Sequence, residues 1–118
     1  KNSYISEIAN SLGVRVSNMI EGEYIYTKDD MISSKRFKNE VLKSEYPIDI
    51  HDKNSTIEPK NATYFLPIEC IKSKGIKNLY VVGRCLSADF EAQSALRVQI
   101  SAFQTGEAAS MDIVKNLT

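Results

Sequence analysis

The stretch "NLYVVGRCLSADFEAQSALRVQISAFQTGEAAS", residues 78–110, has the strongest pattern in this chain. It begins with a nearly unbroken apolar run that ends at Gly83, passes through a polar loop and enters a long amphipathic segment. Such apolar runs are typical of strands buried on both faces of a sheet. The stretch therefore predicts a strand, a loop and a helix over about 95–117. The predicted buried face of this helix is Val98, Phe103, Gly106, Ser110, Ile113 and Leu117. The small residues that would let a neighbouring backbone come close are Ser101, Thr105, Ala108 and Ala109.

The loop after Gly83 would lie at the C-terminal edge of the predicted sheet. In open α/β sheets this edge is where ligands bind, and the N-terminus of a following helix offers free N–H groups and about half a positive charge. Arg84 and Arg97 add fixed positive charge on both sides of the loop, and Glu91 offers an acceptor for a hydroxyl group. The loop is thus a candidate binding segment. The alternative is a plain connection in which Arg84 and Glu91 pair with each other.

The upstream residues predict a mixture of helix and strand. Residues 3–13 carry apolar side chains at helical spacing and predict a first helix. Residues 14–26 are rich in β-branched and aromatic side chains and predict two strands separated by a break. Residues 27–46 begin with the capping candidate Thr27 and predict a second helix, which the Ser33–Ser34 pair could interrupt.

The middle of the chain predicts irregular structure. Residues 47–52 form a short extended piece, and residues 53–63 are polar, contain Pro59 and have no periodicity, so we expect a loop there. Residues 64–71 predict an edge or irregular strand, because Pro67 lacks a backbone N–H.

Composition excludes several classes of function. The 118 residues include fifteen basic and fifteen acidic side chains, so no overall charge attracts nucleic acid or an anionic membrane. No apolar run is long enough for a membrane span, and no signal peptide is visible, which makes the cytoplasm the default location. The chain begins with Lys1, which suggests a processed or shortened chain; a removed N-terminus could have carried an export signal.

Cys70 and Cys85 are the only cysteines, and His51 is the only histidine. Their spacing does not match a zinc site, so we expect no metal. Because the chain has two cysteines, a disulfide is possible, but we expect both cysteines to be small buried residues.

Residues 64–110 resemble the C-terminal segment of FAD-dependent oxidoreductases with the glutathione-reductase-type flavin fold. Weaker similarity continues upstream through "LGVR", "EGEYIYTKDDM" and "YPIDIHD". The matching positions are Pro67, Lys74–Gly75, Asn78–Leu79, Val82–Gly83–Arg84–Cys85, Ser87–Ala88, Glu91–Ala92, Arg97–Val98 and Gly106–Glu107–Ala108–Ala109.

This resemblance implies an α/β fold, or α+β for the isolated chain, that forms the C-terminal part of a Rossmann-like flavoprotein. The N-terminal GxGxxG βαβ unit of such proteins is absent, because no GxG occurs in the sequence. The division implied is a substrate-side segment over 1–62 and a strand–loop–helix segment of the FAD-binding domain over 63–118. The implied flavin-side residues are Gly83, Arg84, Ser87, Glu91, Arg97 and Val98.

The implied function is two-electron redox of a small molecule through FAD, with the rest of the flavoprotein as partner. This chain alone is then not expected to bind FAD tightly or to be active. The substrate-side candidates are Arg15, which could anchor a carboxylate, Tyr24, and His51, which could donate a proton. For Arg15 the alternative is a surface ion pair with Glu21 or Glu23, and for His51 a place in a capped loop.

The rival interpretation is a non-catalytic, free-standing α+β module that serves binding or assembly. The amount of exposed apolar surface distinguishes these two interpretations. A piece of a flavin domain should leave residues 79–82 uncovered on at least one face, unless a second copy pairs with it as a homodimer. A self-sufficient module should bury both faces.

Overall fold

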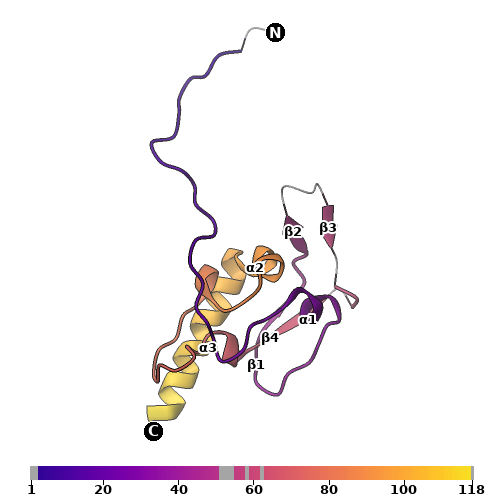
Figure 1. Ribbon diagram of the computed structural model, residues 1–118, viewed down its shortest axis with the longest axis vertical. Helices are drawn as coiled ribbons and strands as arrows, with labels where there is room; N and C mark the ends of the chain where they lie inside the picture. The colour runs from indigo at the N-terminus through magenta and orange to yellow at the C-terminus, as the bar shows by residue number, and fades with distance from the viewer. Residues whose placement is uncertain (1–2, 51–54, 58, 62, 118) are drawn as a thin grey trace.

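The computed structural model describes residues 3–50, 55–57, 59–61 and 63–117. Residues 3–13 run away from the packed part of the chain as an extended segment (Figure 1). This segment explains the longest dimension of 64 Å and the radius of gyration of 16.5 Å, compared with about 13 Å for a compact domain of 100 residues. The regular elements are α1 (Lys28–Ile32), β1 (Glu40–Ser44), β2 (Ile48–Ile50), β3 (Ser55–Ile57), β4 (Tyr64–Pro67), η2 (Ile68–Cys70), η3 (Gly83–Cys85), α2 (Phe90–Leu96) and α3 (Gln99–Leu117).

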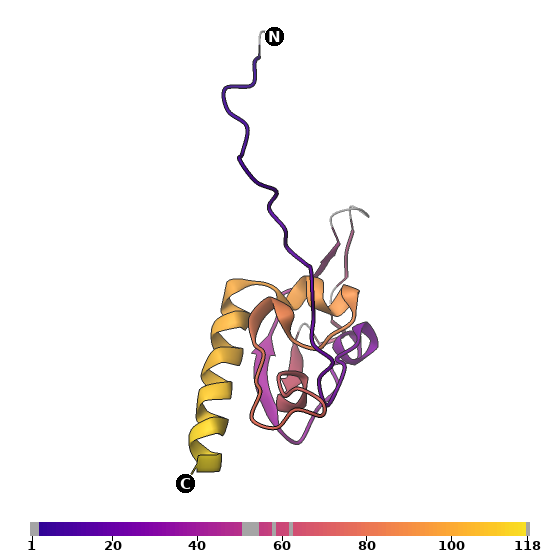
Figure 2. The same cartoon turned by 60° about the vertical axis from the view of Figure 1, so that its left-hand side comes forward.

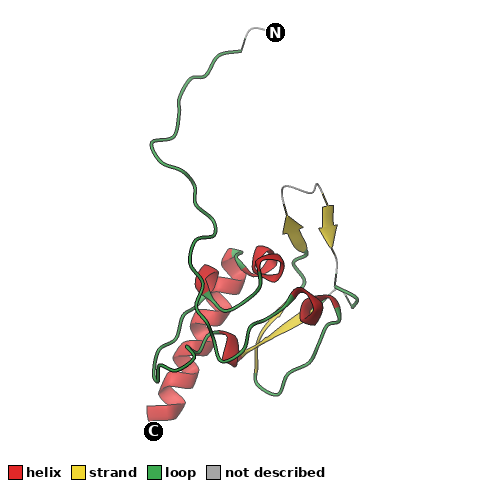
Figure 3. Ribbon diagram, viewed as in Figure 1, coloured by secondary structure: helices red, strands yellow, loops and turns green. Residues whose placement is uncertain are grey.

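The helix predicted for residues 3–13 is absent; the segment is drawn as loop throughout (Figure 3). Its apolar side chains find nothing to pack against, since Tyr4, Ile5, Ile8 and Leu12 are all at least 75% exposed. A helix of this length is marginal in water without a buried face, which explains why the periodicity alone does not produce one here.

The helix predicted to begin after Thr27 does begin there, but it is short. Thr27 and Asp30 form a capping box, in which each side chain accepts a hydrogen bond from the other residue's backbone N–H. The helix α1 ends at Ile32, and Ser34 takes a left-handed conformation with φ 52°. The break at the serine pair is thus confirmed. The continuation of the helix is wrong, because residues 40–44 form the strand β1.

Two small antiparallel sheets hold the middle of the chain. β1 pairs with β4, with Leu42 opposite Leu66 and a register shift next to Glu40, which lies opposite Pro67. The second sheet joins β2 to β3, so the loop predicted for residues 53–63 is interrupted by a strand. Within residues 14–26, the predicted strands are reduced to isolated bridges, Gly22 with Ser73 and Tyr26 with Ala88.

Residues 78–82 do not form the doubly buried strand that their apolar run predicts. Tyr80 forms an isolated bridge with Lys72. The two backbone bonds beside it run from Val81 N–H to the Ile71 carbonyl at 2.8 Å and from Ser73 N–H to the Leu79 carbonyl at 3.1 Å. Leu79 is 41% exposed and Val82 37% exposed. The described residues form a mixture of helices and small antiparallel sheets, which is the α+β type and not an alternating α/β sheet.

The helix predicted from residue 95 onwards is divided into α2 and α3. α3 lies beside β1 and η3 (Figure 2), and it turns small residues inward: Ser101, Thr105 and Ala109 are buried. Phe103 is 75% exposed and Leu117 81% exposed. The close approach of small residues is therefore confirmed, whereas the predicted buried face of the helix is wrong.

A hydrophobic core joins the two-stranded sheet of β1 and β4 to the helices α1 and α2. Its largest fully buried side chains are Tyr26, Tyr64, Met31, Ile48, Leu66, Ile71, Leu86 and Leu96. No helix in the described ranges is long and apolar enough to cross a membrane.

Candidate functional site

The loop after Val82 is shaped by Gly83. This glycine has a backbone φ of +69°, a left-handed conformation that residues other than glycine rarely adopt. Its N–H donates to Oγ1 of Thr105 at 3.2 Å, which joins the loop to the buried face of α3. Gly83 therefore positions the loop and is itself buried.

Hydrogen bonds hold both the backbone and the guanidinium group of Arg84. Its carbonyl accepts a hydrogen bond from Nε2 of the buried Gln93 at 3.0 Å, and its Nη1 donates to the carbonyl of Val14 at 2.9 Å. The second bond joins residues seventy positions apart in the sequence. Because Val14 precedes Arg15, the bond brings Arg15 to the loop.

A cavity of about 370 Å³ opens at this point. This volume is at the small end of the range of about 300–1,000 Å³ for ligand pockets. The cavity is lined by Arg15, Tyr46, Asp49, Arg84, Ser94, Arg97 and Val98, which we call the arginine pocket. Three guanidinium groups and one carboxylate line it, so the lining side chains carry a net charge of two positive units.

The arginine pocket lies where α2 ends and α3 begins. Arg97 is the C-cap of α2, and the Val98 carbonyl accepts from Ala102 N–H in the first turn of α3. The preceding N–H groups of α3 have no partner within the helix. A helix N-terminus attracts negative charge, and here it adds to the charge of the arginines.

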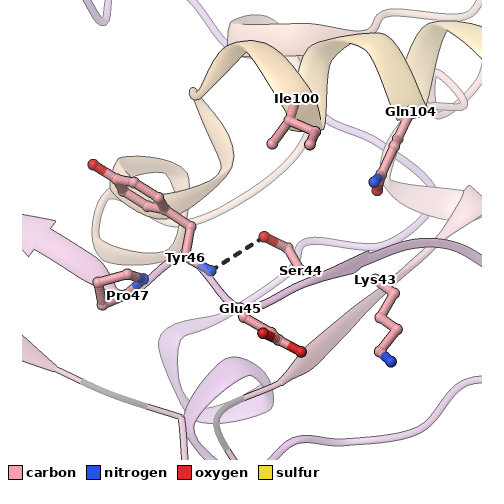
Figure 4. Close-up of a pocket in the computed structure, with 7 residues that line it drawn as sticks. All are labelled: Lys43, Ser44, Glu45, Tyr46, Pro47, Ile100 and Gln104. Carbon is pink, nitrogen blue, oxygen red and sulfur yellow. Dashed lines mark hydrogen bonds between the residues drawn. The ribbon is translucent and has the colours of Figure 1, made fainter.

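A second cavity has a volume of about 530 Å³, and the residues that line it are drawn in Figure 4. Tyr46 lines both cavities. In the view of Figure 4, Ile100 and Gln104 point from α3 toward the strand that ends at Ser44, and Ser44 Oγ accepts from Tyr46 N–H at 3.3 Å. The lining of this second cavity is Lys43, Ser44, Glu45, Tyr46, Pro47, Ile100 and Gln104, and we call it the Tyr46 cavity.

The structure brings together four of the residues singled out from the sequence: Arg15, Arg84, Arg97 and Val98. Glu21, one of the two alternative partners considered for Arg15, forms an ion pair with Lys74. The roles assigned to these four residues stay predictions.

The other flavin-side candidates lie outside the arginine pocket. Ser87 is buried, with its N–H donating to the Cys70 carbonyl and its carbonyl accepting from Tyr26 N–H. Glu91 is in the first turn of α2 and does not line the pocket. Its predicted pairing with Arg84 is not among the described ion pairs or hydrogen bonds. His51 lies outside the described residues.

Tyr24 belongs to a structural cluster instead. Its hydroxyl donates to Oδ2 of Asp30 at 2.7 Å and accepts from Nζ of Lys35 at 2.7 Å. Burial raises the pKa of Tyr24. Burial alone would also raise the pKa of Asp30, but hydrogen bonds from Lys35, Tyr24 and Thr27 outweigh it and lower that pKa. The cluster therefore holds a charged Asp30 at neutral pH.

Several residues of the site were missed from the sequence. Tyr46 precedes β2 and Asp49 lies within it, both far along the chain from Arg84, and no motif links them to it. Gln93 follows the quoted Glu91–Ala92 pair, but only its bond to the Arg84 carbonyl shows its positioning role.

Both cysteines are free thiols. Cys70 is buried, as expected, whereas Cys85 is exposed, against the expectation of two buried residues. No group of His, Cys, Asp and Glu side chains in the described ranges could hold a metal ion.

Comparison with known protein families shows which family the chain belongs to. The chain matches the family described as FAD dependent oxidoreductase over residues 1–114. Because this match covers nearly all of the 118 residues, the chain belongs to the FAD-dependent oxidoreductase family. Searches of curated proteins and of solved structures gave no match.

Proposed function

We propose that this chain is the C-terminal part of an FAD-dependent oxidoreductase of the glutathione-reductase type, and that the arginine pocket contacts the flavin cofactor. The family match over residues 1–114 carries this proposal. It is supported by the convergence of Arg84, Arg97 and Val98, the flavin-side residues implied by the sequence, at one cavity.

The described residues fit one part of FAD. The arginine pocket, at about 370 Å³, suits one end of the cofactor better than a whole dinucleotide, and the sequence has no glycine-rich motif for the ADP moiety. Arg84, Arg97 and the first N–H groups of α3 are donors suited to an electron-rich ring oxygen or a phosphate. Bound flavin would supply two-electron transfer to or from a small-molecule substrate.

These groups would stabilise negative charge on the cofactor. Guanidinium groups stay protonated at any physiological pH, so Arg84 and Arg97 present fixed positive charge. The bond from Gln93 holds the Arg84 backbone, and Gly83 anchors the loop to Thr105. The pocket is thus arranged before any ligand arrives, which favours electrostatic stabilisation.

The remainder of the flavoprotein is the partner that we propose. Residues 79–82 are apolar or aromatic, yet Leu79 and Val82 remain partly exposed, as expected of a piece of a larger sheet. A further strand beside residues 78–82 would cover them and complete the predicted α/β sheet. On this proposal, residues 1–62 supply the substrate side and 63–118 the flavin side.

The first test is the visible absorption spectrum of the natural protein that contains this chain, together with its intact mass. We expect flavin bands, and a loss of bound FAD in Arg97→Gln that does not occur in Lys38→Gln, whose side chain is exposed and does not line the pocket. A colourless 13.2 kDa species that unfolds cooperatively would overturn the proposal in favour of the free-standing module.

A further inference from the structure

We propose that the Arg15 part of the arginine pocket and the Tyr46 cavity together bind the substrate, and that this substrate is a carboxylate with an apolar body. The inference rests on the proposed function in that Arg84 and Arg97 of the same pocket face the flavin. The binding of the carboxylate itself follows from the charges and shapes of the two cavities.

The first argument is the charge of the arginine pocket. Three guanidinium groups line one small cavity with a single carboxylate, that of Asp49. Like charges placed close together repel each other, and an anionic ligand removes that cost. The planar guanidinium group also matches the two oxygens of a carboxylate, so it binds carboxylates in a defined orientation.

The second argument is the position of Arg15. It reaches the pocket on the extended N-terminal segment, and the bond from Arg84 to the Val14 carbonyl fixes the adjacent residue. Arg15 thus approaches from the substrate-side segment, whereas Arg84 and Arg97 belong to the flavin-side segment. An anion held between them would lie at the boundary of the two segments, where a substrate must lie to face a flavin.

The third argument is the chemistry of the Tyr46 cavity. Tyr46 is shared by both cavities, so a ligand held in the arginine pocket can extend past its ring. Ile100 and Pro47 offer apolar surface in this cavity. Lys43 and Glu45, which also line it, carry opposite charges. The combined site therefore suits a charged head and an apolar body.

The experiment measures binding of phenylacetate to the natural protein by isothermal titration. Phenylacetamide, which has the same shape without the charge, is the matched ligand control, and acetate tests the apolar body. The variants are Arg15→Gln, Arg15→Lys and the control Lys38→Gln, each checked for folding by circular dichroism. Bound FAD is measured in the same samples.

We expect phenylacetate to bind more tightly than phenylacetamide or acetate, and Arg15→Gln to weaken it about ten- to a hundredfold, the range for losing a charge-assisted hydrogen bond. Arg15→Lys should lie between, because it keeps the charge but not the two-pronged geometry. Arg15→Gln should retain its FAD.

Three results would overturn the inference. Equal binding of phenylacetate and phenylacetamide would show that charge is not recognised. Unchanged affinity in Arg15→Gln would remove the pocket from the site. Loss of FAD in Arg15→Gln, with inorganic phosphate competing against the cofactor, would assign the arginines to the cofactor's phosphates. Phenylacetate binding that depends on Arg15 in a protein without FAD would instead refute the proposed function and leave the carboxylate site standing.

Discussion

The carboxylate of Asp89 binds the backbone N–H of Lys28, at 2.7 Å, across sixty-one positions of sequence. Its other oxygen accepts from Ala92 N–H at 2.7 Å and caps α2. One side chain thus satisfies the first turns of two helices, α1 and α2, and ties the two halves of the chain together.

Removing this double cap should destabilise the fold. We expect Asp89→Ala to lower the free energy of unfolding by about 1–3 kcal/mol, since a single lost N-cap costs about 0.5–2 kcal/mol. Asp89→Asn should cost less, because it keeps one acceptor oxygen. Urea unfolding measures both, with the exposed Asp29→Ala as control. Equal stability of Asp89→Ala and the parent would show that water replaces both bonds.

The lowered pKa of Asp30 predicts a dependence on pH. A carboxyl group whose pKa is lower in the folded state stabilises that state above the pKa of the unfolded chain, about 3.9. This contribution is lost as the pH falls through the lower, folded pKa. Asp30→Asn should therefore unfold more easily than the parent at pH 7, by about 1–3 kcal/mol, and the difference should shrink below about pH 4. Thermal unfolding from pH 2 to 7 measures it, and a difference that stays constant with pH would contradict the role of the charge.

Two glycines should respond to alanine in opposite directions. A Cβ at Gly22 would lie 2.6 Å from Ser87 Cβ and 3.0 Å from the Glu69 carbonyl oxygen, so Gly22→Ala should cost about 1–3 kcal/mol through overpacking. A Cβ at Gly106 in α3 meets nothing within 4 Å, so Gly106→Ala should stabilise the helix by about 0.5–1 kcal/mol. Chemical denaturation of the two variants side by side tests the packing around Gly22. Similar stability of both would show that the backbone there shifts freely.

The two cysteines should differ sharply in reactivity. Burial raises the pKa of the Cys70 thiol, so little thiolate forms, whereas Cys85 is exposed. A thiol reagent should label one cysteine rapidly in the native protein and the second only on unfolding. Cys85→Ser should abolish the rapid phase. Rapid labelling in that variant would mean that the core around Cys70 opens readily.

Local chemistry made part of the fold predictable. The capping box at Thr27 and the break at the serine pair both follow from residues close together in the sequence. The strand β1 and the inward face of α3 were not predictable in this way, since each depends on what packs against it. Val41 and Leu42 fit a helical stripe as well as a strand, and only the pairing with β4 decides between them.

The candidate site likewise has residues that the sequence could predict and residues that it could not. Arg84, Arg97 and Val98 lie on one continuous segment, and the resemblance to flavoproteins indicated all three. Tyr46 and Asp49 come from a distant segment and carry no motif, so only the folded chain places them at the arginine pocket.

The outward face of α3 has a consequence for the life of the protein in a cell. Ile100, Phe103 and Val114 are each more than 60% exposed, while the small residues of the helix face inward. In cells, chaperones and proteases act on proteins that expose apolar surface. If the proposed remainder of the flavoprotein covers this face, we expect a chain made without it to be degraded faster, so that its abundance depends on that covering part as well as on its own rate of synthesis.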